Sequence, residues 1–190
     1  MSYELDFNWG GHMLRLLVVL CALLALPSAS QARGSSYRPW PTAAQFDSAA
    51  FGWSSQGGSA SVAGSALLRT RGGDIKTCGA LPVQLMPSAA YSDELITRNF
   101  GNGATGFASS PDLIGPASLF AQFVRQTYCD AQGNFEFDEL PPGDYYVIAR
   151  VTWEAFDMIG GTPIGSTEGG YLMQKVHLRV ADRLKIMLTD

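Results

Sequence analysis

The sequence DAQGNFEFDELPPGDYYV at residues 130–147 carries the strongest structural signal in this chain. It begins with a tight turn, because Asp130 can bond its own backbone and Gly133 tolerates positive φ. Phe135 and Phe137 then alternate with acidic residues, the period-two pattern of a half-buried strand. The Pro-Pro-Gly-Asp that follows permits neither a helix nor a continued ladder of strand hydrogen bonds. The stretch therefore predicts turn, strand, turn and strand.

The second of these strands is predicted to be central in its sheet. Its alternate residues place one apolar row on a single face: Tyr145, Val147, Ala149, Val151 and Trp153. The opposite face, which contains Tyr146 and Ile148, is only partly polar. A strand that is apolar on both faces is typical of the middle of a sheet rather than its edge.

Similar alternation predicts further strands at residues 60–70, 76–86, 117–128, 171–180 and 184–188. Ser92 is a good N-cap, and acidic residues follow it, so we expect one short helix at residues 93–98. Residues 88–127 are otherwise rich in turn-forming residues, and residues 154–170 are predicted to form a second Gly-rich loop. The strand count predicts an all-β fold, a two-sheet sandwich of about seven strands with the helix in the 88–127 insertion.

Two segments of the chain resemble carboxypeptidase regulatory-like domains. The first is Gly79-Ala80-Leu81-Pro82-Val83-Gln84-Leu85, and the second and more specific one is the opening motif from Asp130 to Tyr145. The resemblance covers roughly residues 60–190, with residues 88–127 as an insertion. It implies an Ig-like, prealbumin-like (transthyretin-like) sandwich at residues 59–190. It implies no activity, because the motif consists of turn formers and core aromatics.

The charge and composition exclude one class of partner. The net charge is −4, the pI is about 5.1, and the sequence has no basic stripe, which argues against nucleic-acid binding. Residues 33–58 are rich in Ser, Ala, Gly and Pro and are predicted to be a linker or N-terminal arm. Scattered aromatics there, such as Phe51 and Trp53, suggest that part of this segment docks on the domain.

An apolar run at residues 14–26, followed by small residues, reads as a secretory signal peptide at residues 1–32. The run is too short to span a bilayer, which needs roughly 20 residues. Acidic residues precede Met13, so Met13 is a candidate true start. The alternative is an uncleaved anchor. We expect an exported protein, periplasmic or secreted, that does not span the membrane after cleavage.

Two cysteines remain after that cleavage, Cys78 and Cys129. An even pair in an exported chain favours a disulfide, worth about 4 kcal/mol on the chain-entropy model. The alternative is a reactive or metal-binding thiol pair, which lacks a CxxC motif or a neighbouring His to support it.

Aromatic residues in or beside the two irregular segments are the candidate ligand-stacking residues. They are Tyr91, Phe100, Phe107, Trp153 and Tyr171, with Phe120 and Phe156 close by. Rings on loops at one end of a sandwich can stack on a sugar or a peptide. The alternative is that they pack the loops onto the sandwich, the commoner role of aromatic side chains.

The sequence offers little catalytic chemistry. His177 is the one histidine downstream of the signal peptide, no nucleophile-elbow motif is present, and the acids of the opening motif lack the spacing of a calcium loop. We therefore predict no metal, no cofactor and no catalytic residues. The expected function is a non-enzymatic exported module that binds an envelope protein or a glycan through residues 88–127 and 154–170. The alternatives are a purely structural periplasmic domain, or a hydrolase or metal-dependent enzyme with its site in the insertion.

Overall fold

The computed structural model describes residues 44–113 and 118–190. The predicted signal peptide at residues 1–32, including Met13, and residues 33–43 of the predicted linker lie outside this range. The described residues form nine strands: β1 (Ala60–Arg69), β2 (Ile75–Thr77), β3 (Pro82–Pro87), β4 (Thr105–Ala108), β5 (Arg125–Tyr128), β6 (Asn134–Leu140), β7 (Gly143–Ile159), β8 (Thr162–Leu178) and β9 (Arg183–Leu188). They also include helix α2 (Ala90–Phe100) and the 3-10 helices η1 (Ser48–Ser55) and η2 (Ser118–Phe123).

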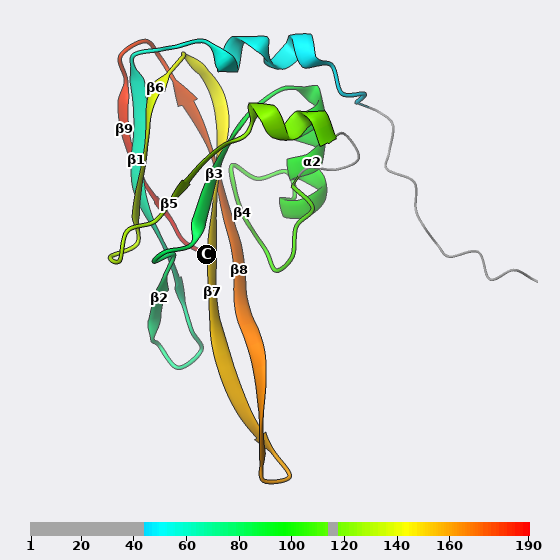
Figure 1. The fold of residues 1–190 in the computed structure, drawn as a ribbon, viewed down its shortest axis with the longest axis vertical. Coiled ribbons are helices and arrows are strands. Elements are labelled where there is room, and N and C mark those ends of the chain that lie inside the picture. Colours follow the sequence, from blue (N-terminus) through cyan, green and yellow to red (C-terminus); the bar gives the residue numbers. More distant parts are fainter. Residues whose placement is uncertain (1–43, 114–117) are drawn as a thin grey trace, which may run out of the picture. The chain divides into compact units, whose positions relative to one another are not determined.

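The strands make two sheets, which confirms the predicted all-β sandwich (Figure 1). One sheet has the order β2-β1-β6, and β9 pairs with β1 in parallel. The other has the order β4-β8-β7-β3-β5 and is antiparallel throughout. Strand β7 lies inside its sheet, between β3 and β8, as its two apolar faces predict. The structure has two more strands than the predicted seven. The predicted strand at residues 76–86 is split into β2 and β3, and β4 was not predicted.

The first hydrophobic core fills the space between the sheets. Its members come from the alternate, inward-pointing residues of both sheets, and include Val62, Leu85, Phe135, Phe137, Val147 and Leu178. Strand β1 contributes Ala60, Val62, Ala66 and Leu68, every second residue, and each is buried. The period-two pattern in the sequence therefore corresponds directly to burial between two sheets.

The opening motif forms the closed end of this core. The Tyr145 hydroxyl donates a hydrogen bond of 2.9 Å to the Pro141 carbonyl, and burial raises the pKa of Tyr145 to about 12. The Trp53 ring of η1 packs edge-on against Tyr145, with ring centroids 5.2 Å apart. A Cβ at Gly143 would overlap the same Trp53 ring, so only a glycine at this position leaves room for the indole.

Asp130 acts as a turn residue rather than a ligand. Its Oδ1 accepts hydrogen bonds from the backbone N–H groups of Gln132 at 2.9 Å and Asn134 at 2.8 Å. Hydrogen bonds from the Asn134 side chain, followed by those from the backbone, lower the pKa of Asp130. This is the local backbone bonding expected of an Asp that opens a hairpin turn.

A second core covers the outer face of the five-stranded sheet. Helices α2, η1 and η2 supply Leu95, Ile96, Phe51 and Phe120, which pack on outward-pointing β7 and β8 residues: Tyr146, Ile148 and Met173. Phe51 and Phe120 lie 5.0 Å apart between ring centroids. Part of the predicted linker thus docks on the sandwich through Phe51 and Trp53.

The predicted loop at residues 154–170 is wrong. Strands β7 and β8 pair continuously from Gly143 with Leu178 to Ile159 with Thr162, and the two-residue turn is Gly160-Gly161. Both turn glycines have positive φ, as a tight hairpin turn requires. Gly165 and Gly169 of β8 face rings of β7, and Gly170 faces the Phe107 ring of β4, so the Gly-rich composition here indicates close packing and not a loop.

The far part of this hairpin pairs with no other described strand. Strand β3 pairs with β7 only over Tyr145–Ala149, and β4 pairs with β8 only over Tyr171–Gln174. Beyond these residues β7 and β8 pair only with each other and run past the other strands (Figure 1). We call residues 152–169 the hairpin arm.

The described residues of the 88–127 insertion also contain more regular structure than predicted. Its expected helix is present, but it begins at Ala90, three residues before Asp93, the first residue after the predicted N-cap. Ser92 lies inside the first turn, where its Oγ accepts a hydrogen bond from the Ala89 N–H at 2.9 Å, so it is not the N-cap. The predicted strand at residues 117–128 is confined to β5, because η2 occupies residues 118–123. In the described part of the chain, no helix is long and apolar enough to cross a membrane.

Candidate functional site

An open groove of about 1110 Å³ lies alongside the hairpin arm. Its walls are the end of β1 with the β1–β2 turn, the end of β4, the inward face of the arm, and the C-terminal Asp190. The first core ends at Leu68 and Val151, so the groove begins where the inward-pointing residues are no longer covered by the other sheet. The groove is therefore a continuation of the space between the sheets, open to solvent.

Two aromatic rings line this groove, Phe107 from β4 and Trp153 from β7. The Phe107 side chain is 47% exposed, and Trp153 is half-buried where it packs against the end of the first core. Both residues point inward, because Phe107 pairs with the core residue Leu172 and Trp153 follows Val151 at a spacing of two. The fold thus brings together two ring side chains that are 46 positions apart in the chain.

Two consecutive glycines of β8 hold these rings close to the backbone. A Cβ built on Gly170 would lie 2.8 Å from Cζ of Phe107, and one built on Gly169 would lie 2.8 Å from Cζ3 of Trp153. Gly169 also has a φ of +92°, which a residue with a side chain adopts only with strain. Gly169 and Gly170 therefore leave the space that the two rings occupy.

Charged groups surround the rings. Arg69 and Arg71 come from the end of β1 and the turn after it, and Asp157, Glu168 and Asp190 come from the arm and the C-terminus. Within residues 44–113 and 118–190, these side chains form no ion pair with one another. Glu168 accepts a hydrogen bond of 3.0 Å from the Ser166 hydroxyl. The groove therefore offers exposed cationic donors and anionic acceptors beside two ring faces.

The other predicted stacking residues lie elsewhere. Tyr91 is 7% exposed in the second core, where its ring packs against Phe46 and Phe120, and Phe120 is itself fully buried. Phe100 and Tyr171 pack against the same core. These rings hold the helices on the sheet, the alternative considered for the whole set, and of the five candidates only Phe107 and Trp153 line the groove.

Cys78 and Cys129 form a disulfide, as predicted, with Cα atoms 5.7 Å apart. The bond is buried in the first core and joins the segment before β3 to the segment between β5 and β6. Its role is structural, because neither sulfur lines the groove along the arm.

A second polar cluster lies at the other end of β7 and β8. Tyr146 donates a hydrogen bond of 2.8 Å to Asp93, which also accepts one of 2.6 Å from Ser88. Burial and then the bond to Asp93 raise the pKa of Tyr146. Burial alone would lower the pKa of Lys175, but its hydrogen bond to Tyr146 and the nearby carboxylates raise it overall. The Lys175 ammonium lies 5.1 Å from the Tyr146 ring centroid.

His177 lies beside this cluster and is exposed, as its position in the strand predicted. Its Nδ1 is 2.7 Å from Oδ1 of Asp144, and both side chains are about half exposed. Among the described residues, no three His, Cys, Asp or Glu side chains are grouped so as to hold a metal ion. The cluster ties helix α2 to the sheet through Asp93 and Tyr146, and does not line the groove.

The charged groove residues were not singled out in the sequence. A signal for part of them existed, because Trp153, Ala155 and Asp157 have the period-two spacing that continues the inward face of β7. The glycines at positions 165, 169 and 170 obscure that signal, because a Gly-rich composition predicts a loop. Arg69 and Arg71 come from a different sheet, and nothing local in the sequence places them near Trp153.

Comparison with known proteins identifies a similar fold. No protein-family model matches the sequence, and a search of curated proteins finds no match. Among solved structures, the chain is similar to the crystal structure of a "putative carbohydrate binding protein" from Pseudomonas aeruginosa. The identity is 25% and the TM-score is 0.61, and the match covers 77% of this chain and 99% of that chain. The similarity therefore extends over almost the whole of the other protein.

Proposed function

We propose that this protein is a non-enzymatic carbohydrate-binding module that holds a glycan in the groove along the hairpin arm. The observation that carries the proposal is the pair of rings, Phe107 and Trp153, in one open groove beside Arg and acidic side chains that form no ion pair within the described part of the chain. The similarity to the "putative carbohydrate binding protein" supports the same class of ligand.

The chemistry of the groove suits a sugar. The apolar C–H face of a pyranose packs on an aromatic ring, and indole gives the largest such surface. Sugar hydroxyls both donate and accept hydrogen bonds, and guanidinium groups donate while carboxylates accept. Arg69 and Arg71 line the groove with Asp157 and Glu168, so both kinds of partner are present. An open groove, rather than an enclosed pocket, fits an oligosaccharide chain of which several units are bound.

The predicted signal peptide adds a location to this proposal. An exported module would meet glycans of the cell envelope or of its surroundings, and residues 1–32 supply the expected export signal. On the two sequence motifs alone, we also infer that the sandwich is a carboxypeptidase regulatory-like domain. That inference concerns ancestry, and the glycan proposal rests on the groove.

The proposal is tested by titrating the protein with a panel of neutral, uronic-acid and amino-sugar oligosaccharides in a calorimeter. Trp153→Ala and Phe107→Ala should each weaken binding of a responsive sugar at least roughly tenfold, since each removes a stacking surface worth about 1.4 kcal/mol or more. Phe156→Ala is the matched control. Phe156 is on the same strand but 73% exposed and outside the groove, so its loss should leave binding unchanged.

Two outcomes would refute the glycan proposal. One is that no sugar of the panel binds the wild-type protein. The other is that a sugar binds and the two groove variants bind it as tightly as the wild type does. Equal losses in Phe156→Ala and Trp153→Ala would place the site at the arm but not in this groove.

The exposed tip of the arm favours a second candidate function, binding of a protein partner. Phe156 and Met158 are large apolar side chains exposed on the face of the arm that points away from the groove, where β7 and β8 pair only with each other among the described strands. Contiguous patches of exposed apolar side chains mark protein contact sites more often than single exposed apolar side chains do. An envelope-protein pull-down with the wild type and with Phe156→Ser/Met158→Ser distinguishes the candidates, because these changes leave the groove intact.

A further inference from the structure

The outer face of the four-stranded sheet differs from that of the five-stranded sheet, because no helix of the described chain packs on it. A shallow trough of about 450 Å³ runs along it. The floor of the trough is the middle strand β1, whose outward-pointing residues Ser61 and Ala63 are small, and Ser59 precedes them. Because the side chains on the floor are small, the walls of the trough are formed by residues of the flanking strands β9 and β6.

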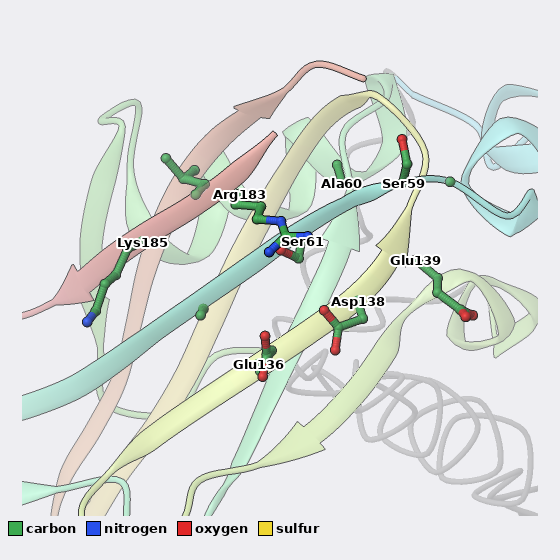
Figure 2. Close-up of a pocket in the computed structure, with 11 residues that line it drawn as sticks. Ser59, Ala60, Ser61, Glu136, Asp138, Glu139, Arg183 and Lys185 are labelled. Atoms are coloured by element: carbon green, nitrogen blue, oxygen red, sulfur yellow. The ribbon is translucent and has the colours of Figure 1, made fainter. Parts of the chain in front are cut away.

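Charge on these walls is sorted by strand. Arg183 and Lys185 lie on β9, on one side of β1, and Glu136, Asp138 and Glu139 lie on or beside the outward face of β6, on the other side (Figure 2). Strands two positions apart in a sheet are separated by roughly 10 Å. In the described part of the chain, the cations of β9 form no ion pair with the acids of β6.

The register places these charges at matching heights along β1. Ala63 pairs with Lys185 on one side and with Glu136 on the other. Ser61 pairs with Arg183 and faces the irregularity in β6 that contains Asp138 and Glu139. Each of the two levels therefore has a cation at one edge, a small residue in the middle and an acid at the other edge.

We propose that this face is the interface of a homodimer. Its two-fold axis lies between the two copies and is parallel to β1. Rotation by 180° about that axis turns one sheet to face the other. It also exchanges the two sides of β1, so β9 of one copy lies opposite β6 of its partner. Height along β1 is unchanged, so Lys185 meets Glu136 and Arg183 meets Asp138 across the interface. By symmetry each contact occurs twice.

The alternative two-fold axis, perpendicular to the strands, is disfavoured by the same charges. That rotation does not exchange the two sides of β1. Strand β9 would therefore face β9 of the partner and β6 would face β6, with like charges opposed. Arg125 does not alter the sorting. Its guanidinium donates to the Asp138 carbonyl at 2.9 Å, and the β6 side keeps its excess of carboxylates. The charges thus select one arrangement of two copies.

The small floor residues allow the two sheets to approach. Packed sheets lie about 10 Å apart, and this spacing leaves room for the longer Lys, Arg and Glu side chains only at the two edges. Met187, 61% exposed and two residues after Lys185, adds apolar surface at the next level, beside Ser65. A second copy is thus the occupant whose shape and charge the face matches.

The proposal is tested by sedimentation velocity over a range of protein concentrations, at low and high salt. The wild type should form a dimer that high salt weakens, because exposed ion pairs are screened. Lys185→Glu and Glu136→Lys should each abolish self-association, or raise its dissociation constant at least roughly tenfold, because each reversal sets like charges opposite each other at two symmetric points.

Mixing restores the complementarity in a way that a structural defect could not. The Lys185→Glu face carries only acids at that level and the Glu136→Lys face only cations, so a one-to-one mixture should form a heterodimer although neither variant associates alone. The double variant Lys185→Glu/Glu136→Lys should dimerise as the wild type does. Asp74→Lys, in the β1–β2 turn and outside the trough, is the control and should dimerise normally.

A wild type that stays monomeric at every concentration would overturn the proposal. So would single variants that dimerise as well as the wild type, since the dimer would then use another surface. The interface lies on a different face from the glycan groove, so loss of the dimer without loss of sugar binding leaves the proposed function standing.

Discussion

The two halves of the β7–β8 hairpin share the same pairing and differ in everything that surrounds them. From Gly143 to Val151, β7 has the first core on its inner face, the second core on its outer face, and β3 at its side. From Thr152 onward it pairs with no described strand other than β8, although Trp153 still packs against the end of the first core. The inner face of the arm becomes the wall of a groove, and its outer face meets solvent.

The comparison shows that strand pairing and burial are separate properties of this chain. The covered half has Tyr, Val, Ile and Ala at successive positions, which satisfy two cores at once. In the arm, apolar residues such as Phe156 alternate with Trp153 and Asp157 of the groove, and none is covered on both sides. Stability should therefore depend on the covered half and ligand binding on the arm.

The largest difference is expected for matched removals of a phenylalanine. Phe137→Ala should destabilise the protein by about 3–5 kcal/mol, because it leaves a cavity in the first core. Phe156→Ala should change the free energy of unfolding by less than about 0.5 kcal/mol, because the ring is exposed. Urea unfolding of both variants measures the difference. Equal losses would mean that the arm is part of the folding core.

Removal of the disulfide should have the next largest effect. Cys78→Ala/Cys129→Ala opens a link between residues 51 positions apart and should cost about 2–4 kcal/mol. Because the link lies in the first core, hydrogen exchange should accelerate at the amides of 143–151 and stay fast and unchanged in the arm. Slower unfolding of the reduced protein than of the oxidised one would contradict this role.

Alkaline pH should act on the covered half through Tyr145. The pKa of Tyr145 is raised from 10.0 to about 12, so its contribution to stability is complete below pH 10 and is lost as pH rises through 12. The shift of the Tyr145 pKa corresponds to about 3 kcal/mol of folding free energy, since each pKa unit is worth about 1.4 kcal/mol. Tyr145→Phe should reduce the fall in stability between pH 10 and 12.

The control for this titration is Tyr128→Phe. Tyr128 is exposed on the edge strand β5, so its replacement removes a phenol hydroxyl without disturbing either core. A Tyr145→Phe profile that follows the wild type at every pH would show that Tyr145 does not limit alkaline stability.

Shortening the arm should have the smallest effect on stability. Replacing residues 155–166 with a two-residue Gly-Gly turn keeps Trp153 and Glu168 but removes most of the unsupported pairs. Thermal unfolding should shift by only a few degrees, corresponding to less than about 1 kcal/mol. Sugar binding should weaken, because Asp157 is removed from the groove wall. A loss of several kcal/mol would show that the arm supports the sandwich.

The same contrast explains what the sequence could predict. The covered half was predicted with its central position, because Tyr145 and Val147 alternate with Tyr146 and Ile148 and both rows are apolar. The arm was predicted as a loop because Gly165, Gly169 and Gly170 interrupt its pattern, although they face rings or pair across the hairpin. Local composition cannot distinguish a glycine that ends a strand from one that makes room for a ring.

The groove was foreseen only in part for a similar reason. Phe107 and Trp153 were among the candidate rings, but Tyr91, Phe100 and Tyr171 were grouped with them because all lie in or near the two irregular segments. The second core, which takes up these three, depends on helices α2 and η2 folding back over the sheet. Arg69 and Arg71 reach the groove through the pairing of distant strands, which no local pattern records.

The central claim is that sugar binds at Trp153, and the indole N–H signals of the ¹⁵N-labelled protein test it most directly. Titration with a responsive oligosaccharide should shift the Trp153 indole signal. The Trp53 indole, packed against Tyr145 and Gly143 at the closed end of the core, should stay in place and serve as the internal reference. A bound sugar that shifts neither signal, or shifts Trp53 and leaves Trp153 unmoved, would contradict the account.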